Sequence, residues 1–265
     1  LDCRDTLDAM SNPDPINSSI KGRGASWNPQ NRFERIEYVH DEAVSQNDDE
    51  PAPLPQTLFL RDPTRTILAH NDSPDVPFDT SINPYRGCEH GCIYCFARPT
   101  HEFLGFSAGL DFETKILVKE DAPELLAAEL AKPKWKPQVL AMSGVTDPYQ
   151  PVERRLEITR RCLEVLARFR NPVAIITKNA LVTRDRDWLG ELAAHQAAAV
   201  NISITSLDPK LQRILEPRTS PPRARLDAVA PLPAPGPPVG ALAAAIIPRP
   251  SPDGRRRGPE GSSSG

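Results

Sequence analysis

Residues 81–96 read Ser81-Ile-Asn-Pro-Tyr-Arg-Gly-Cys-Glu-His-Gly-Cys-Ile-Tyr-Cys-Phe96 and contain three closely spaced cysteines, Cys88, Cys92 and Cys95. Their spacing is C-x3-C-x2-C, and no fourth cysteine lies nearby in the sequence. Cysteine thiolates are the usual ligands of iron–sulfur clusters. Three of them can hold three irons of a cubane cluster and leave the fourth iron open to a small molecule. The spacing therefore favours a cluster that activates a cofactor over one that only carries electrons.

A structural zinc ion is the alternative that the same residues allow. The three cysteines together with His90 or His101 would make a Cys3His ligand set. Zinc sites of this kind usually combine two separated ligand pairs, and this sequence has no second pair. His90 also lies between two of the cysteines, where it would have difficulty reaching the same ion. Of the other cysteines, Cys162 falls on the apolar side of a predicted helix and is interpreted as a buried core residue, and Cys3 as incidental.

Between residues 65 and 216 the sequence alternates between predicted strands and helices. An N-cap pattern at Asp121 and an apolar repeat at helical spacing over 158–169 indicate two of the helices. Alternation at intervals of about 30 residues indicates βαβ units and a parallel sheet, whose active site lies on the loops after the strands. The cysteine triplet follows the first strand, which is the expected place for chemistry. The predicted strands are 80–85, 139–142, 173–177 and 199–204, with 239–247 as a fifth candidate.

Composition divides the chain into three parts. Residues 1–64 are polar and partly proline-rich, and they predict an irregular arm. Within the arm, residues 21–33 carry basic and aromatic side chains that are able to pack on the domain, although most of the arm is expected to be solvated. Residues 65–248 are predicted to form the core, in which prolines at 231, 233 and 235 break a helical pattern. Residues 249–265 predict a disordered tail.

The overall composition excludes several classes of protein. The 265 residues carry a net charge of −3, with 39% hydrophobic and 25% charged residues, so there is no general attraction to nucleic acid or anionic membranes. No apolar run approaches the roughly 20 residues that a membrane span needs, and the first residues do not form a signal peptide. Five cysteines, three of them clustered, do not match a secreted disulfide framework. We therefore expect a cytoplasmic protein.

The stretch from Ser81 to His101 resembles the radical S-adenosylmethionine (SAM) enzymes. It is most similar to their bacterial branch related to spore photoproduct lyase, often labelled DNA repair photolyase-like, and the similarity runs from about residue 21 to 216. The resemblance implies a partial (β/α)6 barrel with a [4Fe-4S] cluster at its mouth. In that family SAM binds the open iron. One electron from the cluster then cleaves SAM to methionine and a 5'-deoxyadenosyl radical, which abstracts a hydrogen atom from a substrate. The protein orients the cofactor and excludes water and oxygen.

The resemblance also implies contacts to SAM at six positions. The aromatic residue just before the last cysteine is expected to lie beside the adenine of SAM. Three residues in the segment after the second strand are expected to bind the amino group of its methionine part. A lysine after the third strand and a polar residue on the fourth strand complete the set. Each of these residue types also has an ordinary role in packing, in a turn or on a solvated surface. The six positions are Tyr94, then Gly144, Thr146 and Asp147, then Lys178, and finally Ser203.

The sequence departs from the lyase pattern in two respects. Spore photoproduct lyase has a hydrogen-donating cysteine after its second strand, and residues 143–147 contain none, so the lesion repair reaction is not expected. Only four βα units are complete and a fifth is broken by prolines, which predicts a barrel truncated at its C-terminus. An inactive fragment, a frameshift and a non-catalytic iron–sulfur or zinc protein are therefore alternatives.

Partners are implied by the same resemblance. We expect an electron donor of the flavodoxin or ferredoxin type and no membrane partner. Nucleic acid as a substrate rests on the family analogy alone. The sequence names neither the substrate nor a catalytic residue.

Overall fold

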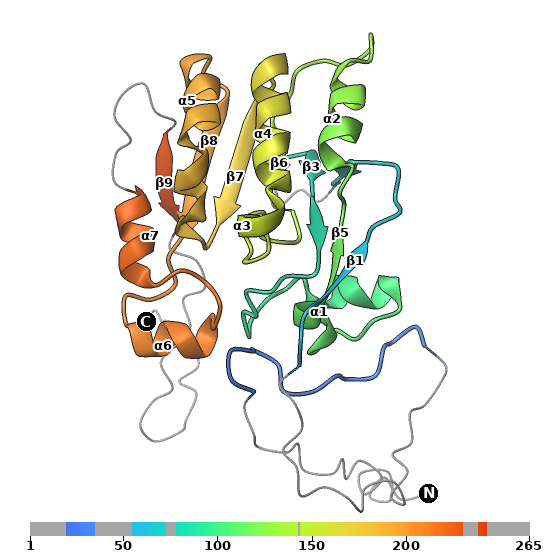
Figure 1. The fold of residues 1–265 in the computed structure, drawn as a ribbon, viewed down its shortest axis with the longest axis vertical. Helices are drawn as coiled ribbons and strands as arrows, with labels where there is room; N and C mark the ends of the chain where they lie inside the picture. Colours follow the sequence, from blue (N-terminus) through green and yellow to red (C-terminus); the bar gives the residue numbers. More distant parts are fainter. Residues whose placement is uncertain (1–19, 35–54, 73–77, 143, 230–237, 243–265) are drawn as a thin grey trace, which may run out of the picture.

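The computed structural model describes residues 20–34, 55–72, 78–142, 144–229 and 238–242. Its centre is a six-stranded sheet in the order β2-β3-β6-β7-β8-β9 (Figure 1). The first of these strands is antiparallel to the second, and all the others run parallel, which confirms the predicted βαβ architecture. The strands are β2 (Leu68–His70), β3 (Thr80–Ile82), β6 (Leu140–Met142), β7 (Val173–Thr177), β8 (Ala198–Ser203) and β9 (Val239–Leu242).

Three helices stand side by side against one face of this sheet (Figure 1): α2 (Ala122–Leu130), α4 (Ile158–Phe169) and α5 (Arg186–Ala194). The middle helix follows the predicted apolar repeat, and its Leu163 and Leu166 side chains are fully buried. Burying one such side chain contributes about 1.5–3 kcal/mol. Cys162 is also fully buried in this core, as expected, and burial raises the pKa of its thiol.

A second, smaller sheet packs beside the first in the order β1-β5-β4. It contains β1 (Leu58–Arg61), β5 (Lys115–Val118) and β4 (Tyr85–Arg86). The first of these strands lies inside the stretch predicted to be irregular, and that prediction is wrong for residues 58–61. Its sequence, Leu-Phe-Leu-Arg, has no alternation of apolar and polar residues, and all four side chains are exposed. Parallel pairing with β5 supplies the ordering that the local sequence does not.

Shorter elements complete the described part of the chain. They are η3 (Arg98–Leu104), α1 (Asp111–Thr114), α3 (Glu153–Leu156), η4 (Ala180–Asp185), α6 (Pro209–Leu215) and α7 (Pro222–Val229). The last helix ends before the prolines at 231, 233 and 235, as the sequence predicts. The fifth strand candidate is confirmed for 239–242, whereas 243–247 and the predicted tail 249–265 lie outside the described residues. None of the helices in the described ranges has the length and apolarity that a bilayer crossing requires.

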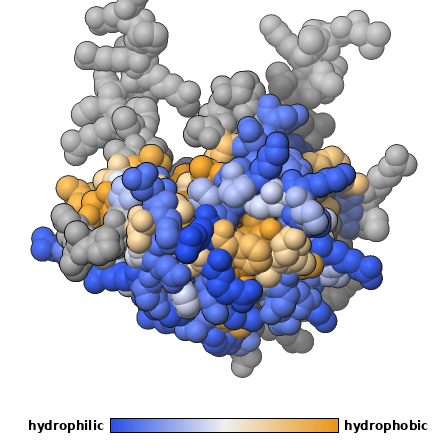
Figure 2. Space-filling view, turned by 90° about the horizontal axis from the view of Figure 1, so that it is seen from above, coloured by the Kyte–Doolittle hydropathy of each residue, from blue (hydrophilic) through white to orange (hydrophobic). Residues whose placement is uncertain are grey.

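The carboxyl ends of the parallel strands all meet at one edge of the main sheet, at the lower end of the molecule in Figure 1, close to α1 and α6. Figure 2 looks onto the opposite end, where hydrophilic residues surround a central hydrophobic area. In βαβ folds the loops at the carboxyl ends carry the functional residues. The cysteine triplet follows β4 in the chain and lies at the carboxyl ends of the main-sheet strands.

Candidate functional site

The three cysteines lie on one loop, residues 87–97, which we call the cysteine loop. Cys88 and Cys92 are buried, Cys95 is half-buried, and all three are free thiols. The backbone of the loop is fixed at its start, where the Cys88 amide donates to the carbonyl of Phe112 at 2.9 Å. Gly87 has a φ of +78°, and a Cβ there would meet His101, Phe112 and Ile116 within 3.1 Å. Only glycine fits this turn, and it brings Cys88 into the interior.

Burial dominates the electrostatics of the thiols. It raises the pKa of Cys88 well above its ordinary value, and the charge of Asp147 raises it further. Burial also raises the pKa of Cys92 to about 12, although the positive charge of Lys178 acts in the opposite direction. Buried thiols of this kind ionise when a cation binds them, because metal binding releases the protons. The donor set therefore fits an iron–sulfur cluster.

The zinc alternative depends on how the three cysteines and the two candidate histidines are arranged. Among the described residues, no group of three or more His, Cys, Asp or Glu side chains is arranged to hold a metal ion. A zinc ion needs ligands that converge on one centre at about 2.0–2.3 Å, whereas each thiolate of a cubane binds a different iron. Each candidate histidine uses one ring nitrogen in a contact within the protein: His101 Nε2 donates to the carbonyl of Lys115 at 3.0 Å, and His90 Nδ1 lies 3.2 Å from Asp147 Oδ2.

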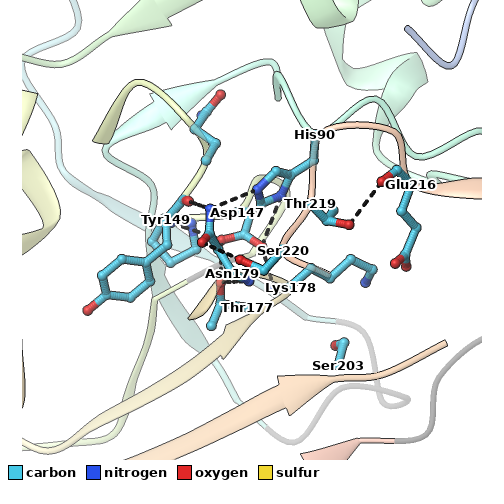
Figure 3. A network of polar contacts seen from close by, with 12 residues as sticks. His90, Asp147, Tyr149, Thr177, Lys178, Asn179, Ser203, Glu216, Thr219 and Ser220 are labelled. Atoms are coloured by element: carbon cyan, nitrogen blue, oxygen red, sulfur yellow. Dashed lines mark hydrogen bonds and ion pairs between the residues drawn. The ribbon is translucent and has the colours of Figure 1, made fainter. Parts of the chain in front are cut away.

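Asp147 is the centre of a polar network that joins three loops (Figure 3). Its Oδ1 accepts from the Tyr149 amide at 2.9 Å and the Thr177 hydroxyl at 2.7 Å. Its Oδ2 accepts from the Lys178 amide at 2.7 Å and contacts His90. Burial alone would raise the pKa of Asp147, but His90 and the hydrogen bonds from Lys178 and Thr177 lower it to about 2. The ionised carboxylate thus connects the loops after β6 and β7 to the cysteine loop.

Two other predicted positions, Gly144 and Thr146, anchor the loop after β6. The Gly144 amide donates to Asn83 Oδ1 at 3.1 Å, and a Cβ at Gly144 would come within 2.9 Å of Ser81 Oγ. The Thr146 hydroxyl donates to the carbonyl of Tyr85 at 3.1 Å and keeps its acceptor capacity. The close approach that Gly144 allows is therefore to the neighbouring strand β3.

The remaining predicted positions gather around Cys92 and the end of β8. Lys178 Nζ lies 5.9 Å from the centre of the Tyr94 ring, and in Figure 3 the lysine side chain extends away from the hydrogen-bonded network. The Tyr94 hydroxyl donates to Glu216 and lies 3.0 Å from Thr205 Oγ1. Burial, followed by the bond to Glu216, raises the pKa of Tyr94. Ser203 is 1% exposed at the end of β8.

Sequence reasoning missed the residues that fix the cysteine loop from outside. The Glu89 amide donates to Gln150 Oε1 at 2.9 Å, and its carboxylate pairs with Arg218 at 3.0 Å. The Ile93 amide donates to the carbonyl of Leu215 at 3.0 Å. A charged residue between two metal-binding cysteines was an available signal at Glu89. Its partners are distant in sequence, and no local pattern indicates them.

The family comparison agrees with this geometry. The family model of the Radical SAM superfamily matches residues 82–233, which is more than half of the chain, so the chain belongs to the radical SAM superfamily. Uncharacterized protein Rv2578c of Mycobacterium tuberculosis is 38% identical over 174 residues, which cover 66% of this chain and 51% of that protein. Uncharacterized protein MJ0683 of Methanocaldococcus jannaschii is 30% identical over 148 residues, which cover 56% and 52%. The chain thus spans about half the length of these relatives.

The fold is similar to that of a solved structure, spore photoproduct lyase complexed with dinucleoside spore photoproduct. The TM-score is 0.53 at 18% sequence identity, and the match covers 72% of this chain and 52% of that chain. At this identity the likeness concerns the fold alone. The predicted partial radical SAM barrel is confirmed over that part of the chain.

Proposed function

We propose that this protein is an enzyme that holds a [4Fe-4S] cluster with Cys88, Cys92 and Cys95 and cleaves SAM reductively. The observation that carries the proposal is the position of these three free thiols on one loop at the carboxyl edge of a parallel sheet. The loops after β6 and β7 are joined to the same place through Asp147. Membership of the radical SAM superfamily supports the same function.

The bound cluster would supply one electron to the SAM sulfonium, which releases methionine and a 5'-deoxyadenosyl radical that takes a hydrogen atom from the substrate. The electron would come from an external donor, for which we propose a protein of the flavodoxin or ferredoxin type. The task of this chain is to bind and orient both cofactors and to keep solvent out.

Lys178 and Tyr94 are the side chains best placed to orient SAM. The Lys178 ammonium is close enough to Cys92 to lower the pKa of that thiol, so its charge would act on any carboxylate bound beside the cluster. Tyr94 is held by its hydroxyl on Glu216, and its ring would stack on the adenine of SAM. Thr146, in the loop after β6, and Ser203, at the end of β8, offer hydroxyl acceptors on either side of β7.

Asp147 and Gly144 have a different role in this proposal. Both carboxylate oxygens of Asp147 already accept hydrogen bonds from within the protein, so we assign this residue to positioning Lys178 and His90. Gly144 lets the loop after β6 approach Ser81 on β3. In this proposal Asp147 and Gly144 support the SAM-binding residues without contacting SAM themselves.

The test is anaerobic reconstitution with iron and sulfide, followed by dithionite and SAM, with 5'-deoxyadenosine measured as the product. We expect product from the wild type and from the core variant Cys162→Ala, and none from Cys95→Ser. A reconstituted wild type that releases no 5'-deoxyadenosine would overturn the proposal. Equal product from Cys95→Ser would also overturn it, because the thiol would then not be needed.

A further inference from the structure

A segment far from the cysteines in the sequence lies directly against the cysteine loop. We call residues 20–34 the clamp segment. The amides of Gly24 and Ala25 donate to the two carboxylate oxygens of Glu113, each at 2.9 Å. The guanidinium of Arg23 donates to the carbonyl of Glu113 at 2.9 Å and to Thr57 Oγ1 at 2.9 Å. Glu113 is fully buried, so its carboxylate depends on these donors.

The same carboxylate also binds Arg98, which holds the cysteine loop. Arg98 Nη2 lies 2.5 Å from Glu113 Oε1. Its Nε and Nη2 donate to the carbonyl of Cys92 at 3.3 and 3.1 Å, and its Nη1 donates to the carbonyl of Gly109 at 3.0 Å. A continuous path of hydrogen bonds therefore runs from the clamp segment through Glu113 and Arg98 to a cluster ligand.

A direct backbone contact accompanies this path. A Cβ placed on Gly24 would lie 1.8 Å from the carbonyl oxygen of Gly91, in the middle of the cysteine loop. A Cβ on Gly91 would in turn lie 2.6 Å from Glu113 Oε2. No side chain fits between these surfaces. Gly22, two residues away in the same segment, has no atom within 4 Å of its Cβ position.

Ordinary surface packing does not require this arrangement. Burying a carboxylate is unfavourable unless charge and hydrogen bonds compensate it. Here Glu113 Oε2 accepts from the Gly24 amide of the clamp segment, while Oε1 accepts from both the Ala25 amide and Arg98, whose guanidinium supplies the compensating charge. The buried charge therefore makes docking of the segment and fixation of Cys92 interdependent.

We propose that the clamp segment is a built-in part of the cluster site, and that Glu113 and Arg98 are positioning residues that fix the Cys92 corner of the loop. This inference rests on the proposed function. The clamp packs against the Gly91 backbone of the cysteine loop, and the Glu113 charge balances that of Arg98 beside Cys92. Loosening the clamp lets the cluster be extracted more easily. Removing the negative charge makes the cluster easier to reduce.

The first experiment compares Gly24→Ala with Gly22→Ala in the full chain. After anaerobic reconstitution, the rate of iron release to a chelator is measured. Because the added methyl of Gly24→Ala collides with Gly91, we expect iron release at least about tenfold faster than in the wild type. The methyl of Gly22→Ala strains a residue with positive φ but meets no other atom within 4 Å, so its rate of iron release should stay within about twofold of the wild type. Equal rates for the two variants would contradict the clamp.

The second experiment measures the midpoint potential of the cluster in Glu113→Gln by redox titration followed by electron paramagnetic resonance. A purely structural role would leave the potential unchanged, whereas the unbalanced Arg98 charge should shift it to a more positive value. If circular dichroism shows that Gly24→Ala does not fold, the midpoint potential of Glu113→Gln still tests the positioning role. An unchanged potential would refute the positioning role while the proposed function stands. A wild type that takes up no cluster would overturn both.

Discussion

Replacing Arg225 by methionine should destabilise the protein strongly, because this side chain is 1% exposed and holds α7 on the end of β8. Arg225 Nη2 lies 2.6 Å from Glu216 Oε2, its Nε donates to the carbonyl of Ser220 at 2.7 Å, and its Nη1 to that of Ser203 at 3.0 Å. Burial alone would raise the pKa of Glu216, but the charge of Arg225 keeps it below its usual value, so both partners are charged. Removing one partner of a buried ion pair typically costs about 3–5 kcal/mol.

That loss is a large part of the about 5–15 kcal/mol by which folded domains are stable. Since 1 kcal/mol shifts the midpoint by about 2–4 °C in a domain of this size, we expect a melting temperature lower by about 10 °C. Urea and thermal unfolding of the cluster-free protein, followed by circular dichroism, measure both quantities. The reference variant, Arg223→Met, lies in the same helix.

Arg223 pairs with Asp227, and the two side chains are 85% and 60% exposed. Its loss should cost less than about 0.5 kcal/mol. Adding Glu216→Leu to Arg225→Met should restore part of the stability, since the unpaired buried charge is removed. Equal stability of Arg225→Met and Arg223→Met would refute the reasoning from burial.

Three further predictions concern stability and the site. Burial lowers the pKa of His101 to about 4, below the value of about 6.5 in the unfolded chain, so the unfolded state binds the extra proton. The contribution of neutral His101 to the free energy of unfolding is therefore fully present above about pH 6.5 and falls by about 3 kcal/mol as the pH drops to 4. In urea titrations, His101→Gln should lack this pH dependence. Lys178→Met should retain iron but bind SAM at least about tenfold more weakly in equilibrium dialysis, and unchanged affinity would exclude Lys178 as a SAM ligand. Serine substitution of Cys88, Cys92 or Cys95 should abolish cluster uptake, measured as iron per chain, whereas serine at Cys162 should not. A variant of one of the three that still takes up the cluster would argue against that cysteine as a ligand.

Much of the fold was predictable because its signals are local. The apolar repeat of α4 recurs at helical spacing and becomes a buried face. The strands β7 and β8 coincide with the predicted ones to within a residue at either end, since short β-branched runs between helices indicate buried parallel strands. The cysteine spacing favoured cluster chemistry over zinc, and together with the surrounding stretch Ser81 to His101 it indicated the radical SAM superfamily, which the family model confirms.

The parts that could not be predicted depend on partners distant in sequence. The exposed strand β1 exists because β5 offers hydrogen bonds, and the short apolar run Leu58-Phe-Leu60 by itself names no partner strand. Glu113 reads as an ordinary charged residue, yet it is fully buried between Gly24 and Arg98. The SAM contact at Asp147 stays a prediction, and its hydrogen bonds from Thr177 and Lys178, in a loop about 30 residues further on, could not be read from the sequence because only the tertiary structure brings that loop there.

The proposal that three cysteines leave one iron free for SAM can be checked by a single spectroscopic comparison. The anaerobically reconstituted protein is reduced, and its electron paramagnetic resonance spectrum is recorded with and without SAM, alongside iron and sulfide analysis. We predict about four irons per chain and a spectrum that changes when SAM is added, because SAM binds the open iron. A colourless protein that retains zinc, or an iron–sulfur signal that SAM does not alter, would contradict the account.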